Sequence, residues 1–296
     1  MFDSERPRAT TYAGLFLVTL ATLMHEILLT RIFSVALSYH FAFMAISVAM
    51  FGMTAGAILV YLRPRAFTEE SAPADLARSA LGYAIALVAS TVVFLRLPID
   101  PSPDLETRKL LAWGASYLLI AVPFVFSGVV VAVALTKFPR ALNRLYAADL
   151  VGAGLGCVLF VVVLPIAGGA TSIIVVATLG AAGAMLFALD VPSKRLRFAA
   201  GGVCAALAVF CVVHGLLERD NRPLIEITDA MKNPVSEYRY LRWNSHSRVG
   251  VAGDPDLPGP APGWGLSEKT DARNVVARAV VVTIDTFIPR VLSTFM

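Results

Sequence analysis

The sequence predicts an all-α polytopic membrane bundle of about seven transmembrane helices, with a short β-hairpin-like tail at the C-terminus. Three observations support this fold class. Of the 296 residues, 57% are hydrophobic and only 16% are charged, whereas soluble domains contain about 25% charged residues. The apolar residues form blocks close to the ~20 residues that a helix needs to cross a bilayer. Beyond residue 217 the chain becomes polar and rich in proline and glycine.

These observations divide the chain into a transmembrane helical bundle, residues 1–217, and a polar tail, residues 218–296. A soluble all-helical protein is the alternative, but its helices would need charged faces toward water, which the blocks lack. A cleavable signal peptide is not expected, because a second apolar block follows the first directly. The predicted transmembrane blocks are 12–30, 41–62, 80–95, 110–135, 151–167, 172–189 and 198–217.

The first block carries ionisable residues near its C-terminal end. His25, Glu26, Thr30 and Arg31 form a candidate intramembrane polar site, because such side chains in a membrane usually line a cavity or contact another helix. The alternative is a helix end at the interface, from which the long Arg31 side chain reaches the headgroups. Glu26 and Arg31 are about 140° apart around a helix, so they do not share a face. Whether they pair with each other or with other helices is left open.

Glycine pairs in the second and fifth blocks have the spacing that lets membrane helices approach closely. We therefore predict that Gly52, Gly56, Gly152 and Gly156 are helix-packing residues. Residues 152–156 read G-x-G-x-G rather than G-x-G-x-x-G, and no predicted strand precedes them. A nucleotide-binding loop is not indicated.

The blocks 80–95 and 151–167 are short, and we expect flanking residues to extend them across the bilayer. Asp149 is predicted to open the fifth helix, where the helix dipole favours a carboxylate and Arg140 or Arg144 is near enough to pair with it. Asp149 is also included in the candidate polar site.

No metal site or cofactor is predicted. Cys157, Cys204 and Cys211 lie in the apolar blocks without a Cys/His cluster and are interpreted as small apolar filling residues. The net charge of +4 is spread over joints and tail, so nucleic acid is not expected as a partner.

Basic residues predict the orientation, because Lys and Arg collect in cytoplasmic joints. Alternate joints place eleven basic residues on the side of the N-terminus and three on the other side. The N-terminus is therefore predicted to lie in the cytoplasm of the cell, with the protein in the inner membrane. Seven spans put the tail outside, whereas a miscounted span would return it to the cytoplasm. The side of the tail is left open.

The tail is predicted to contain two strands. Residues 235–251 and 277–291 are rich in β-branched and aromatic residues. The prolines and glycines of residues 252–265, between them, disfavour regular structure. Two strands alone would form at most an isolated hairpin, which is marginally stable in water.

Three phrases occur in order along the chain: HEILLTRIFSVALSYHFAFMAISVAMFGMTAGAILVYL, RLYAADLVGAGLGCV and RWNSHSRVGV. With them, the sequence resembles the membrane-embedded spermidine synthase-like proteins of bacteria, in which a major-facilitator-like bundle is fused to an aminopropyltransferase domain. The resemblance implies that the tail corresponds to the opening strands of that domain. The family-motif residues of the tail are Trp243, Asn244, Ser245, Ser247 and Arg248.

In the family, a Rossmann-like catalytic domain with a glycine-rich loop follows these strands. Here Thr283–Asp285 resembles the next strand, but no glycine-rich loop or suitably spaced acidic residue follows it. The resemblance therefore implies a truncated product in which the catalytic domain is absent. We expect such a chain to lack aminopropyltransferase activity by itself.

Three hypotheses follow for the function. The chain is an inactive relative of membrane-anchored aminopropyltransferases, or a transporter-like bundle for a small solute, cations included, or a membrane anchor for a separately encoded soluble synthase domain. The lipid bilayer is an expected partner in all three, and a homo-oligomer stays open. An aminopropyltransferase needs cytosolic substrates, which conflicts with a tail on the outside.

Overall fold

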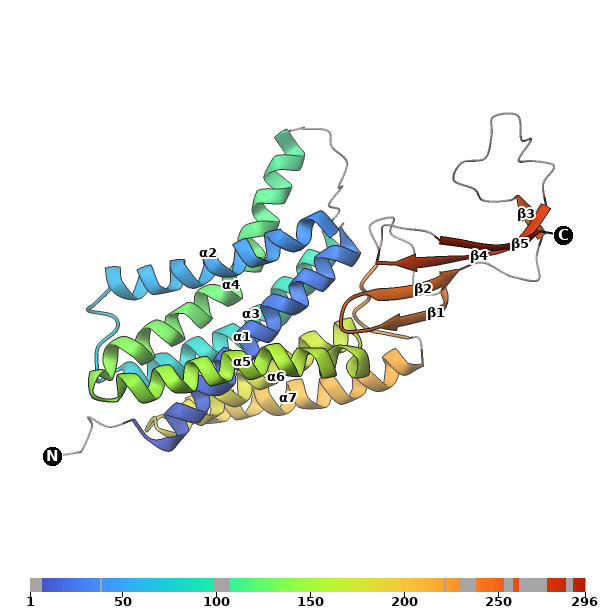
Figure 1. Ribbon diagram of the computed structural model, residues 1–296. Helices are drawn as coiled ribbons and strands as arrows, with labels where there is room; N and C mark the ends of the chain where they lie inside the picture. Colours follow the sequence, from blue (N-terminus) through green and yellow to red (C-terminus); the bar gives the residue numbers. More distant parts are fainter. Residues whose placement is uncertain are drawn as a thin grey trace.

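The computed structural model consists of a helical bundle and a small β-sheet (Figure 1). It describes residues 7–37, 39–97, 107–220, 222–228, 238–252, 258–260, 276–285 and 290–295. Among these residues, seven helices are long and apolar enough to cross a membrane, as predicted. They are α1 (Ala9–Ala36), α2 (Ala42–Leu62), α3 (Ala72–Arg96), α4 (Thr107–Lys137), α5 (Leu142–Ala167), α6 (Gly169–Leu189) and α7 (Lys194–Arg219). The short 3-10 helices η1 (Tyr39–Phe41) and η2 (Pro139–Ala141) precede α2 and α5.

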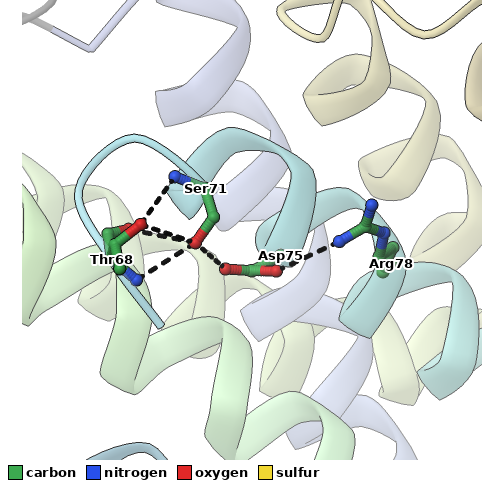
Figure 2. A network of polar contacts seen from close by, with 4 residues as sticks. All are labelled: Thr68, Ser71, Asp75 and Arg78. Carbon is green, nitrogen blue, oxygen red and sulfur yellow. Dashed lines mark hydrogen bonds and ion pairs between the residues drawn. The ribbon is translucent and has the colours of Figure 1, made fainter. Parts of the chain in front are cut away.

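The two short predicted blocks are extended by flanking residues. Helix α3 starts at Ala72 rather than at residue 80, and α5 starts at Leu142 rather than at residue 151. A polar network explains the start of α3 (Figure 2). The Thr68 N–H donates to Ser71 Oγ at 3.0 Å, and Ser71 Oγ donates to Asp75 Oδ2 at 2.6 Å. The Asp75 carboxylate also stabilises the helix because it lies in the first turn.

Helix α1 is the central element of the bundle. It packs against α5 and α6 and also contacts α2 (Figure 1). Leu15, Met24, Leu28 and Phe33 are fully buried although they lie on different sides of α1, as expected for a helix that is apolar all round. The other main contacts join α2 to α4, α3 to α4 and α6, and α7 to α6.

The predicted packing glycines lie at two tight helix crossings. A Cβ atom at Gly52 would lie 2.6 Å from the carbonyl oxygen of Ala121, and one at Gly56 would overlap the carbonyl oxygen of Val125. Helix α2 therefore contacts the backbone of α4 directly. On α5, a Cβ atom at Gly152 or Gly156 would overlap the backbone of α1 in the same way.

Asp190, which follows α6, holds the start of α1. Thr10 Oγ1 donates to Asp190 Oδ2 at 2.6 Å, and Thr11 Oγ1 donates to the same oxygen at 3.1 Å. Arg8 Nη1 lies 3.4 Å from Asp190 Oδ1. The chain start, the α6–α7 joint and the basic residues around it thus share one end of the bundle, and the sheet lies at the opposite end (Figure 1).

The sheet is antiparallel and contains five strands in the described part of the chain. They are β1 (Tyr238–Trp243), β2 (Arg248–Ala252), β3 (Pro258–Pro260), β4 (Val276–Ile284) and β5 (Arg290–Phe295). Strand β2 pairs with β1 and with β4, and β4 also pairs with β3 and β5. Val281 pairs with β2 and β5, and Ala277 with β3 and β5. Strands β2 and β3 therefore follow one another along the same edge of β4.

The prediction of two long strands needs correction. Residues 235–251, expected as one strand, contain the β1–β2 hairpin. Asn244 reverses the chain because its Oδ1 accepts hydrogen bonds from the N–H groups of His246 and Ser247, each at 2.7 Å. Strand β4 matches the start of the second predicted strand but stops before Asp285, and part of the predicted loop forms β3.

Candidate functional site

The junction between the sheet and the bundle gathers buried and half-buried polar side chains from distant parts of the chain. Helix α1 contributes Arg31 and Ser34, which lie on the same face of the helix. Arg31 Nη1 donates to the carbonyl oxygen of His246 at 2.8 Å, and Ser34 Oγ donates to Asp285 Oδ2 at 2.8 Å. The β1–β2 turn and the end of β4 are therefore both attached to α1.

Asp285 connects three elements through short hydrogen bonds. Its Oδ1 accepts from the Arg248 N–H at 2.8 Å, its own N–H donates to the Arg248 carbonyl oxygen at 2.8 Å, and its Oδ2 accepts from Ser34. The backbone has a φ of 50° at this position. Aspartate is one of the few residues that adopt this left-handed conformation readily. Asp285 thus ends β4, pairs with β2 and binds α1.

Arg248 is a buried cation with an exposed fraction of 3%. Its Nη1 donates to the carbonyl oxygen of Ile227 at 2.5 Å. The guanidinium carbon lies 5.9 Å from the centre of the Tyr238 ring and 5.8 Å from that of the Trp243 ring, within the range of cation–π attraction. Trp243 in turn packs on Gly169, where a Cβ atom would lie 2.6 Å from the indole ring.

A small cavity lies under this cluster, between the sheet and the ends of α6 and α7. Its volume is about 60 Å³, which is room for a few water molecules. Its lining residues are Ala170, Glu218, Pro223, Ile225, Ile227, Leu241, Trp243 and Arg248.

A directed chain of hydrogen bonds ends at the cavity wall. His214 is fully buried, and its Nε2 accepts from the Ile225 N–H at 3.1 Å. The proton of the neutral ring therefore lies on Nδ1, which donates to Thr171 Oγ1 at 2.8 Å. The Thr171 hydroxyl in turn donates to Glu218 Oε2. This arrangement fixes the Glu218 carboxylate at the cavity and links α6 to α7.

Gly168 makes room for that carboxylate. It has a φ of 81°, which a residue with a side chain adopts only with strain, and a Cβ atom here would overlap Glu218. The sharp turn between α5 and α6 therefore depends on glycine for two separate reasons.

The structure separates the residues of the predicted intramembrane site. His25 lies in the core, with its ring stacked on Phe124 at 4.6 Å between centroids. Thr30 Oγ1 donates to the Ile27 carbonyl oxygen on its own helix at 2.6 Å. Arg31 reaches the sheet, as described above, and Glu26 is half-buried. Within the described chain, no ion pair joins Glu26 to Arg31.

The prediction that Asp149 opens the fifth helix is wrong. Helix α5 begins at Leu142, because the polar residues before the apolar block continue the helix, so Asp149 lies about two turns inside it. No ion pair joins Asp149 to Arg140 or Arg144 in the described part of the protein. The carbonyl oxygen of Asp149 accepts from Thr19 Oγ1 at 3.1 Å, so Asp149 contacts α1 about 18 Å along the helix from Arg31.

The family-motif residues of the tail build the β1–β2 turn and its support. Asn244 closes the turn, and its Nδ2 donates to Ser247 Oγ at 3.1 Å. Ser245 is half-buried in the turn. Trp243 and Arg248 flank the turn and line the cavity.

Sequence reasoning missed Ser34, Thr171, His214, Glu218 and Asp285 as junction residues. One signal was available: His214 and Glu218 are spaced i, i+4 at the end of the last apolar block, so they share a helix face. The partners Thr171 and Asp285 carry no such signal, because only the tertiary fold brings them near.

Comparison with known proteins identifies no relative: no protein-family model, curated protein or solved structure matches the chain. Among the residues that the structure describes, no group of three His, Cys, Asp or Glu side chains is arranged to hold a metal ion.

Proposed function

We propose that this chain is a multi-pass protein of the bacterial inner membrane whose bundle anchors a small extracytoplasmic β-sheet. The support is the distribution of basic residues over the two ends of the bundle. The end opposite the sheet carries the basic joints, which the positive-inside rule assigns to the cytoplasm. Its basic residues among those described are Arg8, Arg63, Arg65, Arg78, Lys137, Arg140, Arg144, Lys194, Arg195 and Arg197.

Within the membrane, the proposed role is that of a spermidine synthase-like anchor or assembly partner that does not itself transfer aminopropyl groups. The observation that carries this role is the use of the motif side chains. Asn244 closes a turn, Arg248 is bound to the Ile227 carbonyl, and Asp285 joins the strands to α1. These side chains hold the sheet together and onto the bundle, as a rigid platform requires.

An extracytoplasmic sheet would be separated from the cytosolic substrates of an aminopropyltransferase, which favours an anchor over an enzyme. Strand β1 lies at one edge of the sheet. At the edge of a sheet, a partner can add a strand through backbone hydrogen bonds. We propose that a separately encoded synthase-like domain on the same side of the membrane docks at this edge, as a binding partner rather than as an aminopropyltransferase.

Co-purification tests the proposal. The full chain is expressed with a soluble synthase domain and purified in detergent, and the domain is expected to co-elute with the wild type. Asp285→Ala, which loosens the attachment of the sheet to α1, is expected to lose the domain, whereas the exposed control Asp220→Ala retains it. The chain alone is expected to transfer no aminopropyl group from decarboxylated S-adenosylmethionine to putrescine. Measurable turnover by the chain alone would contradict the proposal.

A transporter-like bundle is the second candidate, because the membrane core contains a polar cluster. His25 is 1% exposed, and neither ring nitrogen has a hydrogen-bond partner among the described residues. One turn away, Thr22 Oγ1 lies 2.6 Å from Ser127 Oγ. If the bundle moves a small solute, flux is expected in proteoliposomes, and a cation is the first solute to test. Glu26→Gln or His25→Phe is expected to lower this flux. Flux unchanged by both substitutions would exclude this candidate.

A further inference from the structure

A groove lies between α2 and α4 toward the end of the bundle that carries the N-terminus. It encloses about 750 Å³, within the range of small-molecule sites. On α2, its lining residues recur at helical spacing from Met53 to Pro64, and on α4 from Gly128 to Lys137. All but Tyr61, Thr136 and Lys137 are apolar. The groove is therefore apolar along most of its length and polar at one end.

Glycines determine where the groove closes. A Cβ atom at Gly128 would lie 2.7 Å from the Cα atom of Met53, so the two backbones touch at this level. From there both chains run toward the same end of the bundle, where Pro64 and Lys137 line the opening of the groove. The groove is thus closed near the middle of the bundle and opens at the end lined by Pro64 and Lys137.

The length of the groove corresponds to one lipid leaflet. At 1.5 Å per residue, the helix rise is about 12 Å from Met53 to Tyr61 and about 14 Å from Gly128 to Lys137. The hydrocarbon layer is about 30 Å thick, so one leaflet supplies about half of it. An acyl chain of the leaflet at the basic end would run along the groove without crossing the midplane.

The polar end is cationic. Lys137 is half-buried and lines the groove, and in the described part of the chain no carboxylate forms an ion pair with it. Arg63 and Arg65 flank Pro64 at the same end. Basic residues at this depth attract anionic headgroups.

We propose that the groove binds one anionic phospholipid, with an acyl chain between α2 and α4 and its phosphate at Lys137. This inference rests on the membrane insertion proposed above. The cationic end of the groove favours an anionic lipid over a neutral one. The groove is only as long as one leaflet, so a transmembrane helix of a second copy would extend beyond it.

Native mass spectrometry of the full chain in detergent tests the site, with phosphatidylglycerol and phosphatidylcholine of identical acyl chains as probes. The wild type is expected to retain phosphatidylglycerol about fivefold more strongly, the ratio that one basic residue near a membrane surface provides. Lys137→Gln is expected to abolish this preference. Lys194→Gln, an exposed lysine at the same end of the bundle, is the matched control and should keep it. The groove-filling pair Ala57→Leu and Ala132→Leu is expected to reduce retention of both lipids.

Equal retention of the two lipids by the wild type would overturn the proposal, and so would a preference that survives Lys137→Gln. A lipid-free dimer that the groove-filling pair dissociates would assign the groove to a second copy instead. These outcomes presuppose a protein extracted from membranes. A chain that stays in the supernatant without detergent would instead refute the proposed membrane function.

Discussion

Asp285 is the residue through which β4, β2 and α1 meet. Both of its carboxylate oxygens accept hydrogen bonds, one from the Arg248 N–H and one from the Ser34 hydroxyl. Hydrogen bonds to a charged group contribute about 1.5–3 kcal/mol each. The attachment of the sheet therefore depends strongly on this one side chain.

Replacing this carboxylate should loosen the sheet without unfolding the bundle. Asp285→Ala is expected to lower the free energy of local opening at the Arg248 amide by about 3 kcal/mol, and Ser34→Ala by about 1.5 kcal/mol. Amide hydrogen exchange of the detergent-solubilised protein measures both effects. Asp220→Ala, an exposed aspartate at the end of α7, is the control. Unchanged exchange in β2 of the Asp285 variant would refute this role.

Thr171 is the middle member of the chain from His214 to Glu218. Thr171→Val keeps the shape but removes the hydroxyl, so His214 loses an acceptor and Glu218 loses a donor. We expect a loss of about 2 kcal/mol in stability, because buried polar groups are left unsatisfied. Thr171→Ser retains the hydroxyl and should lose less than half as much. Thermal unfolding in detergent tests the pair, and equal losses would show that packing rather than hydrogen bonding matters here.

Residue types and spacing predicted only part of this site. The sequence left two alternatives for Arg31, a contact with another helix or a side chain that reaches the headgroups. Its partner, the His246 carbonyl, lies in the tail and cannot be found from local sequence. Asp285 was interpreted only as part of a strand motif. A strand-like sequence does not indicate that its last residue adopts a positive φ.

At the scale of elements, two glycines of α5 offer an internal comparison. A Cβ atom at Gly156 would lie under 3.0 Å from the carbonyl oxygen of Leu20, whereas one at Gly154 would meet nothing within 4 Å. Gly156 faces α1, and Gly154 faces away from it.

Alanine substitution should therefore have opposite effects at the two positions. Gly156→Ala is expected to lower the Tm because α5 must move away from α1. Gly154→Ala is expected to leave the Tm unchanged or raise it slightly, since alanine is the better helix former by about 1 kcal/mol. A fluorescence-based melting curve of both variants checks this, and equal shifts would contradict the assigned crossing.

Apolar block length predicted the seven long helices of the described chain, because the need to satisfy backbone groups in lipid leaves a helix as the main solution. The starts of α3 and α5 were predicted less well. Ser71 and Asp75 form a polar network at the start of α3, before its apolar block, and hydropathy does not report such a network. Asn244, Ser245 and Ser247 are turn-forming residues, but the β1–β2 hairpin was missed because residues 238–243 and 248–251 on either side favour strands.

At the scale of the whole molecule, α1 connects the two opposite ends of the bundle. Its start is bound by Asp190 at the end with the basic joints, and its final turns are bound to the sheet by Arg31 and Ser34. The seven helices place the N-terminus and the sheet at opposite ends (Figure 1). Seven predicted spans, an odd number, give these opposite ends, but the side of the tail was left open, since one miscounted span would reverse it.

Labelling of single cysteines in cells tests the central claim most directly. Cys157, Cys204 and Cys211 are first replaced by alanine, and a cysteine is then introduced as Arg195→Cys or Arg242→Cys, both exposed and at opposite ends. A membrane-impermeant maleimide is expected to label Arg242→Cys while the inner membrane is intact, and Arg195→Cys only after it is disrupted. The reverse pattern, or equal labelling of both before disruption, would contradict a bundle that spans the membrane with its sheet outside.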